Sequence, residues 1–201
     1  MSIESYTNFI QCRENSDKLL TKIDEVLNQS ILAPCDILPL RSDKKDEHLL
    51  DKHFGIDCIV IKYKETIKEF RMTIQNKTIG YDWWSNKRYW KNNYPNFCQE
   101  TINAHNTSFE RPGEWTYLTS QLIFLGYKNI TGDNFDRWVL LNTLSYKLKI
   151  DLNGGLEKFG KFYSGSTNGK SAYHVLSLGD FQDCIVDSSD RHTGKQQLTF
   201  L

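Results

Sequence analysis

Two adjacent segments of β-type residues constrain the fold of this chain most strongly. Residues 56–63 (IDCIVIKY) and 67–74 (IKEFRMTI) are rich in β-branched and aromatic side chains, and a short polar connection separates them. Two such segments joined by a short turn predict a β-hairpin. Placing Asp57 opposite Gln75 centres the turn on residue 66, within the polar connection. Pairing Asp57 with Glu69 would instead bend an apolar strand, so we prefer the first register.

The preferred register assigns each hairpin residue to a face. Cys58 then lies opposite Ile74 and Val60 opposite Met72, and alternation adds Phe70, so one face is apolar throughout. Lys77 falls opposite Gly55. The other face carries the polar side chains Asp57, Arg71, Thr73, Gln75 and Lys77.

Three residues of this polar face have a specific chemical use. The Asp57 carboxylate and the Gln75 side-chain carbonyl are oxygen ligands of the kind that Mg²⁺ prefers. A bound ion lowers the pKa of a water ligand, and Lys77 would orient the nucleophile or stabilise negative charge in the transition state. By spacing alone, an ordinary solvated sheet face explains the same residues, and this alternative stays open.

The remaining pattern predicts a mixed α/β or α+β fold with a central sheet in a single domain, residues 1–201. Residues 16–28 have the apolar spacing of an amphipathic helix, and 32–46, with two prolines and a charge run, indicate a loop. We expect a helix over 114–126, ending at a glycine. The segment 135–141 predicts a strand, 145–150 a short helix or strand, and 171–178 a late strand.

Composition limits the classes of function. The hydrophobic fraction of 39% describes a globular protein, and the longest apolar runs are too short to span a membrane. Five cysteines without a CxxC pair argue against a zinc site and for a reducing, cytoplasmic setting. Lys plus Arg equals Asp plus Glu at 25 each, so contact with nucleic acid requires a local patch.

The best candidate for such a patch interleaves aromatic and basic residues between 83 and 91. Rings that stack on bases and cations that pair with phosphates are typical of nucleic-acid surfaces. Tryptophans are also common in protein cores, so a structural role is the alternative. His53, close to Asp57 in the sequence, is a further candidate for phosphate contact, or else an ordinary surface residue. The candidate nucleic-acid residues are therefore His53, Trp84, Lys87, Arg88 and Lys91.

The sequence around the hairpin resembles the PD-(D/E)xK nuclease superfamily. Gly55-Ile56-Asp57 followed by Gln75-Asn76-Lys77 is similar to the pattern of Mrr-type restriction endonucleases and related phage proteins. EWTYLTSQLIFLGY, from residue 114, resembles the helix after the catalytic strands of that family, and FDRWVLLN resembles the strand that follows it. The similarity spans residues 45–185 in order, and its specific motifs are the two short ones.

The resemblance implies a restriction-endonuclease-like central mixed sheet flanked by helices, cleavage of DNA that depends on Mg²⁺ or Mn²⁺, and commonly a homodimer. It implies that Asp57 and Gln75 bind the metal and that Lys77 is the catalytic cation. Roles in restriction, phage DNA metabolism or defence would fit this activity.

Gln75 departs from the commoner glutamate and removes one negative charge from the metal site. A catalytically inactive nuclease-fold protein that binds DNA or a protein partner is therefore the alternative. Members of the family often carry a further acid on a helix. The candidates here are Glu25, Glu47 and Asp51, and we favour Asp51 as a third metal ligand because it is nearest to the site in sequence.

Overall fold

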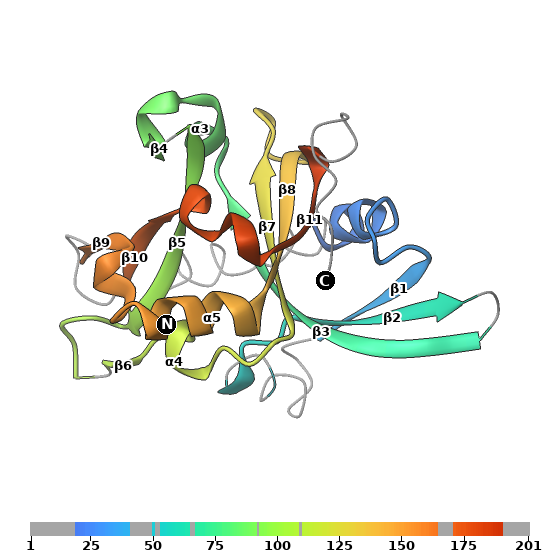
Figure 1. The fold of residues 1–201 in the computed structure, drawn as a ribbon, viewed down its shortest axis with the longest axis horizontal. Coiled ribbons are helices and arrows are strands. Elements are labelled where there is room, and N and C mark those ends of the chain that lie inside the picture. Colours follow the sequence, from blue (N-terminus) through green and yellow to red (C-terminus); the bar gives the residue numbers. More distant parts are fainter. Residues whose placement is uncertain are drawn as a thin grey trace, which may run out of the picture.

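The structure is a computed structural model that describes residues 19–40, 50, 53–64, 67–91, 93–108, 110–164 and 171–190 (Figure 1). The fold is α+β, as predicted. Residues 19–27 form the first described helix. The strands are β1 (Cys35–Pro39), β2 (Cys58–Lys64), β3 (Ile67–Ile79), β4 (Trp90–Lys91), β5 (Tyr94–Asn103), β6 (Arg111–Pro112), β7 (Leu122–Lys128), β8 (Phe135–Asn142), β9 (Gly160–Tyr163), β10 (Ala172–Ser177) and β11 (Ile185–Ser188).

Short helices connect these strands. Among the helices between strands whose full range is described, three have α-helical geometry and three have the tighter 3₁₀ geometry, labelled η. In chain order they are α3 (Tyr81–Ser85), η1 (Lys87–Tyr89), α4 (Glu114–Tyr117), α5 (Thr143–Leu152), η2 (Leu156–Lys158) and η3 (Leu178–Cys184). None of the helices in the described ranges is long and apolar enough to cross a membrane.

A six-stranded sheet with the order β1-β2-β3-β7-β8-β11 forms the centre of the fold. The hairpin of β2 and β3 has the predicted register, with Cys58 opposite Ile74 and Val60 opposite Met72. β3 and β7 are the parallel pair, and the other neighbouring strands run antiparallel. Because β2 begins at Cys58, Gly55 is not part of the ladder. The predicted pairing of Lys77 with Gly55 is therefore not formed, and the described strand partner of Lys77 is Leu125 of β7, on the other side of β3.

The two faces of the central sheet bury separate apolar clusters. One face packs against the first helix through Ile23, Val26 and Leu27, and includes Cys58 and Ile74 of the hairpin. Cys58, Val60 and Ile74 of the predicted apolar face are therefore core residues and Met72 packs against them, while the side chain of Phe70 lies outside the described part of the structure. The opposite face contacts α5, η3 and a second sheet, with the buried residues Phe97, Ile123, Leu125, Tyr146, Leu176 and Phe181. In Figure 1, α5 and η3 lie in front of the region between the two sheets.

The predicted helix over 114–126 is wrong for most of its length. Only Glu114–Tyr117 is helical, and Leu122–Lys128 is the strand β7 in the middle of the sheet. Six of its residues, from Leu122 to Tyr127, are buried. A strand covered on both faces has a continuous apolar run without alternation, and such a run has no period that separates it from a buried helix.

The predicted loop over 32–46 is also partly wrong. Cys35–Pro39 is the edge strand β1, paired antiparallel with β2. Pro39 is tolerated there because it lies at the end of an edge strand, where a ladder hydrogen bond is not lost. Residues 41–46 of the predicted loop lie outside the described residues.

Three further predictions can be compared with the structure. The predicted strand at 135–141 is confirmed as β8, and the segment 145–150 belongs to the helix α5. The late strand is confirmed as β10, but it belongs to a second sheet that the sequence analysis did not predict. That antiparallel sheet has the order β4-β5-β10-β9, with β6 added beside β5.

The last described strand is tied to the start of the fold. Asp187 of β11 is 4% exposed, and its carboxylate accepts hydrogen bonds from the backbone N–H groups of Ile31 (2.7 Å) and Ser188 (2.9 Å). The bond to Ile31 joins the turn after the first helix to the edge of the sheet opposite β1. A buried carboxylate held by backbone donors in this way is a structural contact.

Candidate functional site

Asp57 lies immediately before β2 and contacts the middle of the Gln75-Asn76-Lys77 motif. Its backbone N–H donates to the carbonyl of Ile74 at 2.9 Å, which extends the hairpin by one bond. Its carboxylate Oδ2 accepts from the backbone N–H of Asn76 at 2.6 Å. The Asp57 side chain, which is half-buried, is therefore held against the motif on β3 that the sequence analysis paired with it.

Gln75 is buried, with 8% of its surface exposed. It is aligned with Ile123 of β7, so its side chain lies on the sheet face that packs against α5 and the second sheet. Its Oε1 atom is buried and has no hydrogen-bond partner among the residues that the structure describes. A buried carbonyl oxygen without a donor is costly, and an amide oxygen is one of the ligand types that Mg²⁺ accepts.

Gly55 leaves room for this amide. Its φ of +58° is in the left-handed region that favours glycine. A Cβ at this position would lie 3.2 Å from both Gln75 Oε1 and the Cα of Leu118. Gly55, Gln75 and Leu118 therefore meet at one point. The glycine of the Gly-Ile-Asp motif thus allows three segments of the chain to approach closely.

Lys77 forms an ion pair with Glu114, the first residue of α4. The two side chains are 12% and 13% exposed, so the pair is largely removed from water. Glu114 Oε2 accepts the hydrogen bond from Lys77, while Oε1 is buried without a partner in the described part of the chain. Sequence reasoning missed Glu114. The Pro112-Gly113 pair directly before it, which marks the start of a new element, was the available signal.

Contacts with α5 and β5 hold α4 in place. Lys147 of α5 donates to the backbone carbonyls of Trp115 and Leu118, each at 3.2 Å, and its Nζ lies 5.0 Å from the centre of the Trp115 ring. The N–H of Gly113 donates to the carbonyl of Thr101 in β5 at 2.9 Å. Partial burial lowers the pKa of Lys147. This lysine caps the last carbonyls of a one-turn helix and so fixes the place of Glu114.

Two other reactive groups near the pair are unsuited to act as nucleophiles. Burial raises the pKa of the Cys98 thiol to about 11, although the charge of Lys77 acts in the opposite direction. Burial, helped by the charge of Glu114, also raises the pKa of the fully buried Tyr146. Both groups are therefore protonated near neutral pH.

The other predicted acids do not join this cluster. Asp51 and Glu47 lie outside the described residues. Glu25 is exposed on the first helix, where it pairs with Lys22 at 2.9 Å. That helix covers the opposite face of the sheet from Gln75, so Glu25 is separated from the candidate site by the sheet itself.

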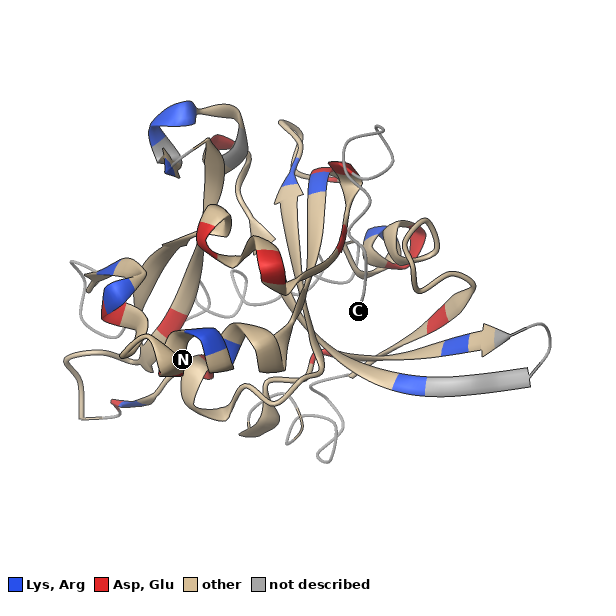
Figure 2. Ribbon diagram, in the orientation of Figure 1, with Lys and Arg blue, Asp and Glu red and all other residues tan. Residues whose placement is uncertain are grey.

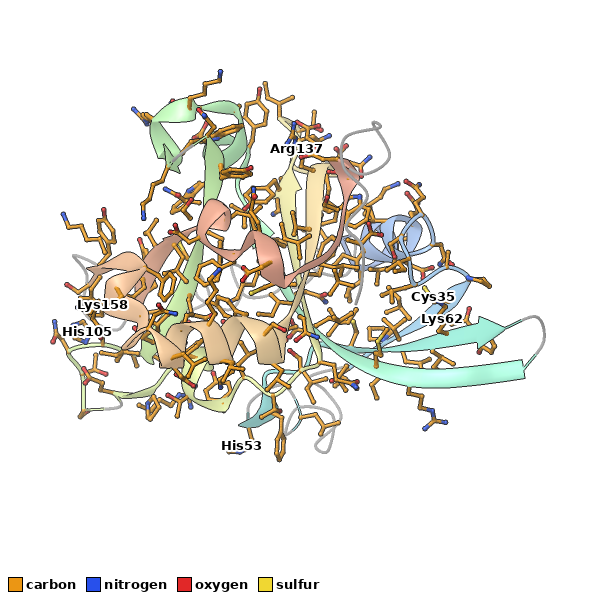
Figure 3. All side chains as sticks on the ribbon, in the orientation of Figure 1. Cys35, His53, Lys62, His105, Arg137 and Lys158 are labelled. Carbon is orange, nitrogen blue, oxygen red and sulfur yellow. The ribbon has the colours of Figure 1, made fainter. Side chains whose placement is uncertain are left out.

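The candidate nucleic-acid residues lie in two places. Lys87 and Arg88 of η1 and Lys91 of β4 are exposed, and Figure 2 shows this basic group at the top of the view. Lys91 also contacts Asp180 at 3.1 Å. Trp84 belongs to α3, and the position of its side chain is not described. His53 is exposed and lies at the bottom of the molecule in Figure 3, far from the basic group in this view.

The residues around β3 that could hold a cation are its oxygen donors. They are the carboxylates of Asp57 and Glu114 and the amide of Gln75, around one short stretch of strand, beside Lys77. Mg²⁺ sites commonly use one or two carboxylates together with waters and substrate oxygens. No group of three or more His, Cys, Asp or Glu side chains that could hold a metal ion is found in the described ranges.

Comparison with known proteins gives no relative: no protein-family model, no curated protein and no solved structure matches this chain.

Proposed function

We propose that this chain is a metal-dependent deoxyribonuclease of the PD-(D/E)xK superfamily that hydrolyses DNA phosphodiester bonds with Mg²⁺ or Mn²⁺. The observation that carries the proposal is the contact of the Asp57 carboxylate with the backbone N–H of Asn76, within a motif whose Gln75 oxygen is buried and has no partner among the described residues. Two motifs eighteen residues apart in sequence thus form one group on the hairpin.

Each residue of the group has a role in the proposed reaction. Asp57 and Gln75 Oε1 would hold the ion, as Mg²⁺ prefers carboxylate and carbonyl oxygens. The bound ion would supply an activated water and neutralise charge on the phosphate. Lys77 would orient the nucleophile or stabilise the negative charge that develops in the transition state. Its ion pair with Glu114 holds the ammonium group in a position that is largely removed from water.

The wider function belongs to the same proposal. DNA would be contacted through the exposed Lys87, Arg88 and Lys91, with Trp84 and His53 as further candidates. A homodimer in a reducing, cytoplasmic setting would suit a nuclease of restriction, phage DNA metabolism or defence.

A cleavage assay tests this function. Supercoiled plasmid is incubated with the protein and Mg²⁺ or Mn²⁺, and the parent chain is compared with Asp57→Ala and Lys77→Ala. We expect each change to reduce cleavage by at least about a hundredfold while DNA binding is retained. Asp136→Ala and Lys158→Ala change exposed residues of the same types and serve as matched controls. Cleavage that survives both site changes would reject the assignment.

A catalytically inactive, DNA- or protein-binding relative is the second candidate. Two observations favour it: Gln75 is neutral where a carboxylate is commoner, and Lys77 is already neutralised by Glu114. Such a protein binds DNA or a partner without cleaving DNA at any divalent metal. The same assay, with binding measured in parallel, separates the two candidates.

A further inference from the structure

Because Gln75 is neutral, Asp57 supplies the one negative charge among Asp57, Gln75 and Lys77, and the positive charge of Lys77 cancels it. Asp57 contributes −1 and Lys77 contributes +1, so the motif alone offers a divalent cation no net attraction. A centre that holds Mg²⁺ or Mn²⁺ on this hairpin therefore needs a further carboxylate. The residue that would supply it should lie on the same face of β3 as Gln75 and Lys77.

Glu114 meets this requirement. The segment from Glu114 to Leu118 runs alongside β3, because Glu114 contacts Lys77 and Leu118 meets Gln75 at Gly55. Four residues of helix rise about 6 Å and two residues of strand about 6.7 Å, so the two contacts match in spacing. Glu114 is thus placed beside the Gln75–Lys77 face by backbone geometry, and Lys147 fixes that placement by capping α4.

The carboxylate of Glu114 uses only one of its two oxygens in the ion pair. Oε2 accepts from Lys77, whereas Oε1 is buried and has no partner among the described residues. The Oε1 atom of Gln75 is also buried without a partner among the described residues, and the whole residue is 8% exposed. Gln75 Oε1 and Glu114 Oε1 are thus both buried oxygens without a described partner, and a divalent cation bound by the two would satisfy them.

We propose that Glu114 supplies the second carboxylate of the metal centre, with Oε1 directed to the cation and Oε2 to Lys77, and so replaces the charge that Gln75 lacks. The inference rests on the proposed nuclease function, since it concerns the same site. In this arrangement the second acidic residue of the centre lies on α4 and not at position 75 of β3, and the total charge of the centre is the same. Glu114 then has two tasks: it binds the cation and it positions the catalytic lysine.

A charge-exchange experiment tests this proposal. Mn²⁺ binding to the full chain is measured by calorimetric titration for the parent, Glu114→Gln, Gln75→Glu and the double variant. We expect Glu114→Gln to weaken Mn²⁺ binding at least about tenfold, and the double variant to return to the affinity of the parent. Glu157→Gln, which alters a glutamate with a 76% exposed side chain, is the matched control and should bind like the parent.

Glu114→Gln keeps a side-chain oxygen that can accept from Lys77, so the fold should persist, and near-UV circular dichroism checks it. A second measurement leaves Glu114 unaltered. Tb³⁺ bound at Glu114 would be excited through the adjacent indole of Trp115, so Trp115→Phe should reduce the sensitised emission. Trp138→Phe should not, because Trp138 packs in the cluster on the opposite face of the sheet.

The outcomes distinguish this inference from the proposed function. If Glu114→Gln and the parent bind Mn²⁺ equally while Asp57→Asn loses binding, Glu114 is not a ligand and the nuclease proposal stands. A double variant that stays as weak as Glu114→Gln also rejects the charge replacement. If the parent binds neither Mn²⁺ nor Tb³⁺ and cleaves no DNA, both proposals fall together.

Discussion

Removing Lys77 from its ion pair should destabilise the protein far more than removing a lysine from a surface pair. In the parent, Lys77 and Glu114 are 12% and 13% exposed, and Lys77 is the partner of Glu114 Oε2. In Lys77→Met the apolar stem is kept, but the Glu114 carboxylate is left buried with neither oxygen paired. The perturbation therefore isolates the cost of an uncompensated buried charge.

The magnitude follows from this burial. Breaking a buried pair by deleting one partner typically costs about 3–5 kcal/mol in the free energy of unfolding. An exposed pair contributes under about 1 kcal/mol, and the Lys22–Glu25 pair, with side chains 34% and 52% exposed, is of that kind. Replacing both buried partners, as Lys77→Met with Glu114→Leu, removes the uncompensated charge and should recover most of the loss.

Urea unfolding followed by fluorescence measures these differences. If the free energy of unfolding falls by roughly 2–3 kcal/mol per molar urea, the midpoint of Lys77→Met should fall by roughly 1–2.5 M, while Lys22→Met should stay close to the parent. The reasoning is refuted if both lysine variants shift the midpoint equally, or if the double variant is as unstable as the sum of the single ones. Either result would mean that water screens the Lys77–Glu114 pair.

Three other predictions concern different parts of the fold. Burial lowers the pKa of His174 from its ordinary value of 6.5, so as the pH falls the unfolded chain binds a proton before the folded chain does. The free energy of unfolding should therefore be constant above about pH 6.5 and fall below it. His174→Leu should flatten this slope in unfolding titrations. Gly126→Ala would place a methyl group 2.4 Å from a Phe135 ring carbon and should cost about 1–3 kcal/mol by thermal unfolding, whereas Gly80→Ala, with open space around it, should cost little. If DNA binds at η1, Arg88→Ala should lower the slope of log affinity against log salt by about one, measured by fluorescence anisotropy, with no change in Lys158→Ala.

The hairpin was predictable because its information is local. Alternation of apolar and polar residues fixes which side chains share a face, and the position of the turn fixes the register. Both are contained in residues 56–77, and the pairing of Cys58 with Ile74 followed directly from them. The pairing at Gly55 failed because the strand β2 begins three residues later, and strand ends are the least constrained part of such a pattern.

The second sheet and Glu114 depended on contacts between distant residues. β5 pairs with β10, so that Cys98 is aligned with Val175, and nothing in either segment specifies that partner. Lys77 meets Glu114 only because the chain between the parallel strands β3 and β7 folds back through β5 and α4. The buried strand β7 was mistaken for a helix for a related reason: its environment on both faces comes from other parts of the chain.

The contact between Asp187 and Ile31 has a consequence for the order in which the protein can be completed. During synthesis the first helix emerges long before β11, yet the turn that follows this helix obtains a hydrogen-bond acceptor only when Asp187 arrives, 156 positions later. Until then β8 is an open edge that can pair with another strand. A nascent chain stalled before residue 185 should therefore be prone to association through β8, and release of the last strand should suppress it.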